Sequence, residues 1–174
     1  MSRINYNLTQ IKGIVFDIDG VLSPSTIPMD IDGNPLRMVN IKDGYAIQLA
    51  VKHNYKIAII TGAFSKAIDV RYNGLGVKDV FQKVAMKKPV LLSWMKDNGL
   101  SPEEVAYVGD DIPDLECLQT VGLSVCPADA AEEVKANSVF ISKATGGYGV
   151  GRELIEEIMK ASGCWMSSEK AFGW

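Results

Sequence analysis

The sequence has little of the residue types that mark metal-rich or disulfide-rich proteins. It contains one histidine, His53, and three cysteines, Cys117, Cys126 and Cys164, with no CxxC pair. An odd number of cysteines without paired spacing does not predict a disulfide framework or a zinc site. We therefore expect free thiols in a reducing compartment. His53 lies at the end of a predicted helix, where we expect it to be structural or solvent-facing.

Long hydrophobic runs and an excess of positive charge are also absent. An apolar run such as 57–60 is far too short to span a membrane, and residues 1–10 lack the apolar core of a signal peptide. Lysine and arginine number 18 against 21 aspartate and glutamate, which gives a formal net charge of -3. Nucleic acids and acidic membrane surfaces attract clustered cations. We therefore expect a cytoplasmic protein with neither nucleic acid nor membrane as its main partner.

A length of 174 residues favours a single domain over 1–174 and leaves little chain for a second domain that could cap an active site. Within it we expect a β-hairpin at about 25–42. The tail from about 162 to 174 has no clear periodicity. Disorder is the default expectation for such a terminus. The alternative is that its aromatic side chains pack on a neighbouring molecule or cover that molecule's active site; they are Trp165, Phe172 and Trp174.

Apolar runs of strand length alternate with amphipathic segments of helix length. Strands are predicted at 11–17, 55–61, 80–81, 105–109, 123–126 and 138–141, and helices at 43–53, 65–73, 88–98, 113–121, 129–136 and 152–161, the first of them capped by Asp43. This alternation predicts an α/β fold, a doubly wound parallel sheet of the Rossmann type with helices on both faces. In such sheets, ligands bind beyond the carboxyl ends of the strands.

Acidic residues, a hydroxyl and lysines follow the predicted strands at that edge. They are Asp17 and Asp19 after the first strand, Thr61 and Gly62 after the second, Lys87 and Lys88 near a helix start, and Asp110, Asp111 and Asp114 after the third long strand. Each alone fits a turn or a helix cap. Together, the carboxylates repel one another and raise one another's pKa unless a cation lies among them. A Mg²⁺ ion, which prefers oxygen ligands, would remove that cost.

The residue types at these positions suit phosphoryl transfer. Asp17 and Asp19 are two apart and point the same way from an extended segment, so one can attack phosphorus while the other serves as general acid and base. Gly20 allows a sharp turn that brings backbone N–H groups to an anion. Thr61 can donate to phosphate oxygens, a lysine adds positive charge, and Asp110 completes the metal shell.

In chain order, these motifs closely resemble those of the haloacid dehalogenase superfamily. The pattern DxDGVL is matched at 17–22, the pair (S/T)G at 61–62, the motif lysine by Lys87, and GDDxxD at 109–114. Lys88 is the adjacent alternative for the lysine.

The resemblance implies roles for individual residues. Asp17 is then the nucleophile that forms an aspartyl-phosphate, and Asp19 protonates the leaving group and later activates water. Mg²⁺ is held by Asp17, the backbone carbonyl of Asp19, and Asp110. We expect Asp111 and Asp114 to orient Lys87 and the metal-bound waters.

A narrower resemblance covers residues 11 to about 161. The segments NIKDGYAI (40–47), LGVKDVFQ (75–82) and GGYGVGRE (146–153) look like those of the capless sugar-acid phosphatases of the 3-deoxy-D-manno-octulosonate 8-phosphate phosphatase type. This resemblance implies that substrate, a hairpin that joins the centre of a homotetramer, and neighbouring subunits that help to cover each site. We expect Arg152, after the glycine-rich loop, to contact substrate because arginine suits a carboxylate.

Two departures from that pattern keep other substrates open. Ala63 stands where the octulosonate enzymes usually have arginine, and Tyr148 where they often do. The alternatives are a nonulosonate 9-phosphate phosphatase and a broad small-sugar phosphatase. Outside enzymes, a receiver-type signalling domain has a different motif order, and a catalytically silent oligomerisation module would not need the full set of motifs.

Overall fold

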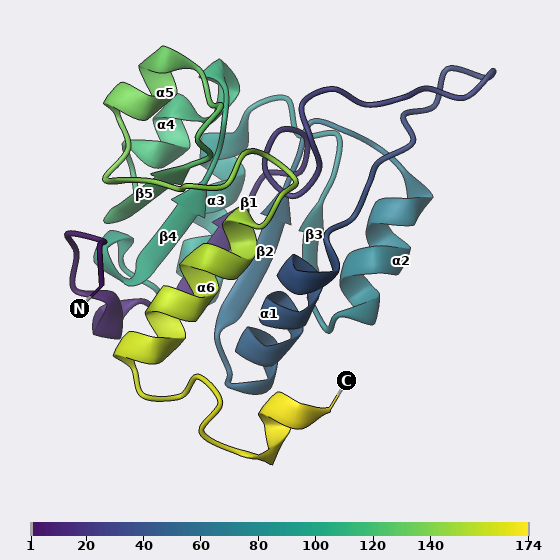
Figure 1. Ribbon diagram of the computed structural model, residues 1–174. Helices are drawn as coiled ribbons and strands as arrows, with labels where there is room; N and C mark the ends of the chain where they lie inside the picture. The colour runs from purple at the N-terminus through teal and green to yellow at the C-terminus, as the bar shows by residue number, and fades with distance from the viewer. Residues whose placement is uncertain (1, 174) are drawn as a thin grey trace.

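In the computed structural model, which describes residues 2–173, six strands form one parallel sheet in the order β3-β2-β1-β4-β5-β6 (Figure 1). The strands are β1 (Gly13–Phe16), β2 (Lys56–Ile60), β3 (Asp79–Phe81), β4 (Val105–Val108), β5 (Leu123–Cys126) and β6 (Phe140–Ile141). This order confirms the predicted doubly wound α/β fold. Strands β2 and β3 are added on one side of β1, and β4, β5 and β6 on the other, so the strand order reverses between β1 and β4. Folds of this kind bind ligands in the crevice beyond the carboxyl ends of these two strands.

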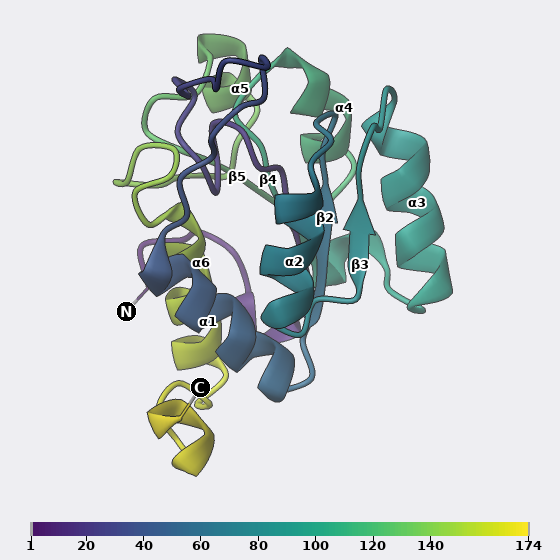
Figure 2. The same cartoon turned by 90° about the vertical axis from the view of Figure 1, so that its right-hand side faces the viewer.

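Helices cover both faces of the sheet (Figures 1 and 2). They are α1 (Ile41–Lys52), α2 (Lys66–Gly74), α3 (Lys87–Asp97), α4 (Leu115–Leu118), α5 (Glu132–Ala136) and α6 (Val150–Ala161). The core on one face joins α1, α2 and α6, and the core on the other joins α3, α4 and α5. Successive strand residues serve opposite faces, so Ile14 and Phe16 belong to the first core and Val15 to the second. Helices α4 and α5 are shorter than the predicted 113–121 and 129–136.

The residues that seemed scarce in the sequence have ordinary surroundings. Cys117 and Cys126 are buried free thiols, and Cys164 is a half-buried one. His53 is half-buried at the end of α1. Within residues 2–173, no helix combines the length and the apolar character needed to cross a bilayer.

Asp43 caps a helix, but not the one that the sequence predicts. Helix α1 begins earlier, and its N-cap is Asn40, whose side chain accepts from the N–H groups of Lys42 at 2.8 Å and Asp43 at 3.2 Å. Asp43 Oδ1 instead accepts from the N–H of Arg152 at 2.7 Å, in the first turn of α6. Burial raises the pKa of Asp43 to about 6. The side chain thus joins the start of α6 to α1.

The segment between β1 and α1 projects from the sheet edge as an arm, residues 25–40 (Figure 1). Its two limbs are joined by one antiparallel bridge between Met29 and Pro35. At the tip, Asp30 Oδ1 accepts from the N–H groups of Asp32 and Asn34 at 2.9 and 2.8 Å. Within the described chain the arm holds no β-strand, so the expected β-hairpin is not confirmed.

The tail folds back onto its own chain at the end of the molecule opposite the arm (Figure 1). The hydroxyl of Tyr45 in α1 donates to the carbonyl of Ala171 at 2.5 Å, and the ring of Trp165 meets that of Tyr45 edge to face, with centroids 6.2 Å apart. Trp165 therefore packs against its own chain, and its packing on a neighbouring molecule stays a prediction. Phe172 is exposed, and Trp174 lies outside the described residues.

Candidate active site

Carboxylates from separate loops meet in the crevice beyond β1 and β4. Asp17 directly follows β1, and its N–H donates to the carbonyl of Val108 in β4 at 3.0 Å, which fixes the start of the loop. Asp110 follows β4, and Asp114 lies one turn further along the chain. One carboxylate oxygen of each of Asp17, Asp110 and Asp114 lies within 4.8 Å of the others. The structure thus brings Asp17 to Asp110 and Asp114, which lie more than 90 residues further along the chain.

Lys87, at the start of α3, reaches into this group. Its Nζ lies 3.1 Å from Oδ1 of Asp17 and 2.7 Å from Oδ1 of Asp114, and the side chain is buried. The next residue, Lys88, points elsewhere, with its Nζ 3.6 Å from the exposed carboxylate of Glu116. Of the two candidate lysines, Lys87 is therefore the one that lies in the crevice.

Asp114 positions its neighbours. It is 1% exposed, and its Oδ1 also accepts from the hydroxyl of Tyr107 in β4 at 2.7 Å. Its Oδ2 accepts from the N–H of Asp110 at 3.2 Å. Since both oxygens already accept hydrogen bonds, Asp17 and Asp110 are the better candidates for metal ligands. Asp111 is exposed and acts on Asp110 through its charge, so Asp114 and not Asp111 holds Lys87.

Burial disfavours the charged forms of the carboxylates in this cluster. It raises the pKa of Asp17 to about 7, to which the charge of Asp114 adds and which Lys87 only partly offsets. Burial and the charge of Asp17 raise the pKa of Asp110 to about 7. Burial acts to lower the pKa of Lys87, but the charges of Asp17 and Asp114 outweigh it and raise that pKa above its ordinary value. The raised pKa values show that two negative charges in this crevice are unfavourable without a further cation, so a bound cation would stabilise the ionised carboxylates.

The backbone around Asp110 fits a divalent metal site. Gly20 has φ +86°, and a Cβ there would lie 1.9 Å from Oδ2 of Asp110. The carboxylate therefore packs directly against the turn after β1, next to the backbone of Asp19, whose carbonyl is the third expected ligand. Carboxylate and carbonyl oxygens are the donors that Mg²⁺ prefers. Asp17, Asp110 and the carbonyl of Asp19 thus suit this ion.

The substitution Gly20→Ala is expected to weaken binding of a divalent cation at least about tenfold. The new methyl group would displace the Asp110 carboxylate, and the left-handed backbone costs alanine about 1–2 kcal/mol. Gly99→Ala is the matched control, because Gly99 has φ +64° and open space around its Cβ position. Thermal melts with and without Mg²⁺ separate the two effects. Equal Mg²⁺-induced shifts in Tm for both variants would contradict this account of the site.

Thr61 and Gly62 lie beyond the carboxyl end of the neighbouring strand β2. Thr61 is 2% exposed, and its Oγ1 accepts from the N–H of Ala63 at 3.1 Å, which stabilises the turn. A Cβ on Gly62 would meet only the carbonyl of Val84, at 3.6 Å. Their contact with a phosphate stays a prediction.

The side chain of Arg152 contacts protein side chains away from the carboxylate cluster. Its Nε lies 2.7 Å from Oε2 of Glu156, and its guanidinium lies 4.7 Å from the ring centre of Trp165 and 5.6 Å from that of Tyr45. These contacts place it between α1, α6 and the tail. Its contact with substrate stays a prediction, for which the observed contacts give no support.

The glycine-rich loop before α6 packs against the turn after β1. A Cβ on Gly146 would lie 2.0 Å from the carbonyl oxygen of Gly20, and the N–H of Gly147 donates to the carbonyl of Val21 at 2.8 Å. Glycine is needed here because two backbones approach each other closely. The loop thus supports the turn that carries Asp19.

Arg37, in the arm, contacts the site, although no sequence pattern predicts this contact. Its Nε and Nη2 donate to Oδ1 and Oδ2 of Asp19 at 2.7 and 2.8 Å, and its side chain is 11% exposed. Nothing in the spacing of the motifs marks an arginine 18 residues beyond Asp19 as its partner.

Comparison with known families agrees with this arrangement. A family model described as haloacid dehalogenase-like hydrolase matches residues 47–154. The chain belongs to the haloacid dehalogenase-like hydrolases. Within this group it is 35% identical, over 88% of its length and 81% of the relative's, to the 3-deoxy-D-manno-octulosonate 8-phosphate phosphatase KdsC of Salmonella typhi. Membership of the hydrolases removes the alternative of a receiver-type signalling domain.

Solved structures of haloacid dehalogenase-like hydrolases have the same fold. One is 3-deoxy-D-manno-octulosonate 8-phosphate phosphatase from Moraxella catarrhalis in complex with magnesium ion, phosphate ion and KDO. It has a TM-score of 0.86 and 32% identity, with 90% of each chain covered. A probable phosphatase of the yrbi family from Pseudomonas syringae has a TM-score of 0.90 and 34% identity, with 95% of this chain and 94% of that one covered.

Proposed function

We propose that this protein is a Mg²⁺-dependent phosphatase that hydrolyses 3-deoxy-D-manno-octulosonate 8-phosphate. The observation that carries the proposal is the buried cluster of Asp17, Lys87, Asp110 and Asp114 beyond β1 and β4. The chain is also 35% identical to KdsC phosphatase of Salmonella typhi over 88% of its length. The Moraxella catarrhalis relative is described with magnesium, phosphate and KDO bound, which matches the chemistry of the cluster.

The proposed reaction has two steps. Asp17 attacks phosphorus and forms an aspartyl-phosphate, while Asp19 gives a proton to the departing sugar oxygen. Asp19 then takes a proton from water, the water oxygen attacks the same phosphorus, and inorganic phosphate leaves Asp17 as a carboxylate. Lys87 stabilises the charge on Asp17 and on the phosphoryl oxygens, and Thr61 donates to those oxygens. When bound, Mg²⁺ neutralises phosphate charge and orients the group for attack.

A phosphate-release assay tests the substrate. Purified protein with Mg²⁺ is offered 3-deoxy-D-manno-octulosonate 8-phosphate, a nonulosonate 9-phosphate and glucose 6-phosphate in parallel. We expect kcat/KM to be at least about tenfold higher for the octulosonate ester, because a site built for a substrate's polar groups discriminates against esters that lack them. A preference for the nonulosonate ester would change the substrate but not the chemistry. Similar efficiency on all three would contradict a specific enzyme.

Binding of Mg²⁺ is expected to weaken as the pH falls. Asp17 and Asp110 have pKa values of about 7 in the metal-free folded chain, against 3.8 as the ordinary value. The folded chain therefore holds extra protons between about pH 4 and 7, which favours the metal-free fold at the lower end of that range. Mg²⁺ must displace these protons, so its affinity should fall about tenfold per pH unit for each proton released.

Thermal melts at pH 8 and pH 6, with and without Mg²⁺, measure this effect. The rise in Tm on adding Mg²⁺ is expected to be larger at pH 8. Asp110→Asn should remove most of the rise at both pH values, whereas the exposed control Asp97→Asn should keep it. A rise that is the same at both pH values would contradict this assignment of the metal ligands.

We also propose that the enzyme is a cytoplasmic homotetramer in which neighbouring subunits help to cover each site. Large apolar side chains of the arm support this, because they are at least half exposed in the single chain and would be buried by a partner; they are Met29, Ile31, Leu36, Met38 and Val39.

A further inference from the structure

The ion pair between Arg37 and Asp19 is the most direct link between the arm and the site. Both oxygens of Asp19 accept a hydrogen bond from one edge of the guanidinium, at 2.7 and 2.8 Å. Such two-point contacts between arginine and carboxylate are stronger than neutral hydrogen bonds and define the orientation of both groups. Arg37 lies two residues beyond Pro35, which forms the arm's antiparallel bridge with Met29, so the contact with Asp19 joins the arm to the turn after β1.

This contact opposes the first step that Asp19 must perform. To protonate the leaving oxygen, Asp19 must carry a proton and turn one oxygen toward substrate, and a guanidinium on both oxygens prevents this. We propose that Arg37 is a specificity-determining residue that holds Asp19 until the carboxylate of a sugar-acid substrate replaces Asp19 on the guanidinium. The inference rests on the proposed function and adds to it the group that recognises the acid.

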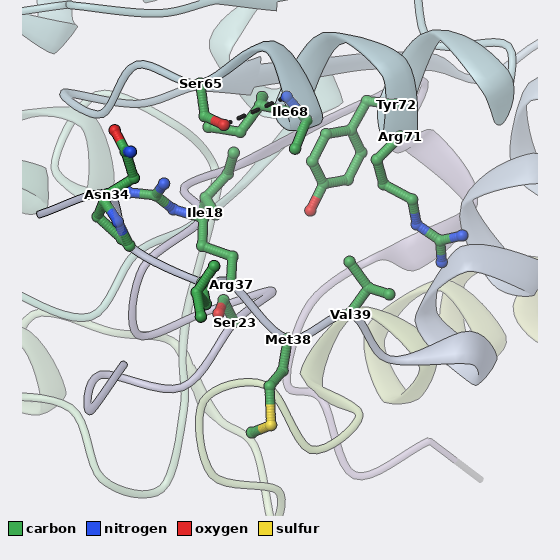
Figure 3. A pocket seen from close by; sticks show the side chains of 13 residues that line it. Ile18, Ser23, Asn34, Arg37, Met38, Val39, Ser65, Ile68, Arg71 and Tyr72 are labelled. Atoms are coloured by element: carbon green, nitrogen blue, oxygen red, sulfur yellow. Dashed lines mark hydrogen bonds between the residues drawn. The ribbon is translucent and has the colours of Figure 1, made fainter. Parts of the chain in front are cut away.

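The cavity beside Arg37 can receive such a group. It has a volume of about 330 Å³, lies between the arm and α2, and is lined by Ser23, Arg37 and Tyr72 among others (Figure 3). Within residues 2–173, Nη1 of Arg37 and Oγ of Ser23 are buried and have no hydrogen-bond partner. Burial raises the pKa of Tyr72, so its hydroxyl stays protonated. These groups match the carboxylate and hydroxyls of a sugar acid.

When the substrate's carboxylate replaces Asp19 on Arg37, Asp19 is released for catalysis. Arginine stays charged in proteins, so the guanidinium of Arg37 needs an anionic partner. A sugar acid supplies that partner when Asp19 leaves. A sugar phosphate without a carboxylate would leave the buried guanidinium unpaired, which is strongly unfavourable. The ion pair thus selects against sugar phosphates that lack a carboxylate.

Replacement of Arg37 tests the inference with two substrates. With Arg37→Met, we expect KM for 3-deoxy-D-manno-octulosonate 8-phosphate to rise at least about tenfold, because the carboxylate loses its partner. For glucose 6-phosphate, which has no carboxylate to replace Asp19, kcat/KM should rise, because Asp19 is no longer held. Arg37→Lys should lie between the two, since lysine keeps the charge but not the two-point contact. Thermal melts check that each variant is folded.

Other outcomes separate this inference from the proposed function. An equal loss of kcat on both substrates would mean that Arg37 only positions Asp19 or the arm, and would overturn the inference. A wild-type enzyme without preference for the acid substrate would overturn the proposed function first. Calorimetry with free 3-deoxy-D-manno-octulosonate gives a readout independent of turnover, and unchanged affinity in Arg37→Met would also overturn the inference.

Discussion

Replacing Asp17 with asparagine is expected to reduce kcat for phosphate release by at least about 10³-fold, because an amide cannot form the acyl phosphate that the reaction requires. The fold should persist. Asp17 is buried and its pKa of about 7 shows that the charged form is already disfavoured there, so a neutral amide of the same shape is tolerated. Initial rates at saturating Mg²⁺ and far-ultraviolet circular dichroism measure the two effects.

Asp111→Asn is the matched control for this substitution. Asp111 lies next to Asp110 in the chain but is exposed, so the change should alter kcat by no more than a few-fold. Rapid acid quenching of the wild-type reaction, followed by peptide mass spectrometry, should find phosphate on Asp17. A variant Asp17→Asn that keeps more than a tenth of the wild-type rate would place the nucleophile elsewhere.

Replacing Lys87 with methionine is expected to lower kcat about 10²- to 10³-fold, as removal of a preorganised charge from a buried site typically does. Lys88→Met should change kcat less than about twofold, because its pairing with Glu116 is exposed and weak. The two variants remove the same group from adjacent positions. Because both variants lose one positive charge, a difference in kcat between them would depend on where the lysine lies and not on the net charge of the protein.

The loss of Lys87 also has a consequence for stability. Its ammonium group pairs with Asp17 and Asp114, and without it two buried acids lack their cation. The pKa of Asp17 should rise further, so Lys87→Met should be destabilised more at pH 8 than at pH 6. Melting curves of the metal-free protein at both pH values measure this difference. A loss of stability that does not depend on pH would show that the lysine is not the partner of these acids.

The sheet and the strand-end cluster could be predicted because local sequence determines them. Runs such as 57–60 are apolar on both faces, which only a strand between two helix layers requires. The strand order then follows from the fold class, and it brings Asp17 to Asp110. The motif resemblance predicts Lys87 as the lysine of the site, and the structure places it in the crevice.

The remaining contacts depend on packing that no local pattern records. Asp43 has the right residue type and spacing to cap α1, but it caps α6, which is distant in the chain. Arg37 lies in an irregular arm, so neither a period of 2 nor one of 3.6 applies to it. Tyr107 could have been noticed, because a tyrosine in an apolar buried strand usually has a hydrogen-bond partner.

The central place of β1 also bears on how the protein is made. β1 pairs with β2 on one side and with β4 on the other. During synthesis β2 leaves the ribosome long before β4. The loop after β1, which carries Asp17 and Asp19, therefore lies beside an unpaired edge of β1 until β4 pairs with it. Contacts between such distant segments form slowly. With Asp110 as the proposed metal ligand, a nascent chain that ends before it is expected to bind no Mg²⁺. The appearance of Mg²⁺ binding would then mark the moment when β4 joins the sheet.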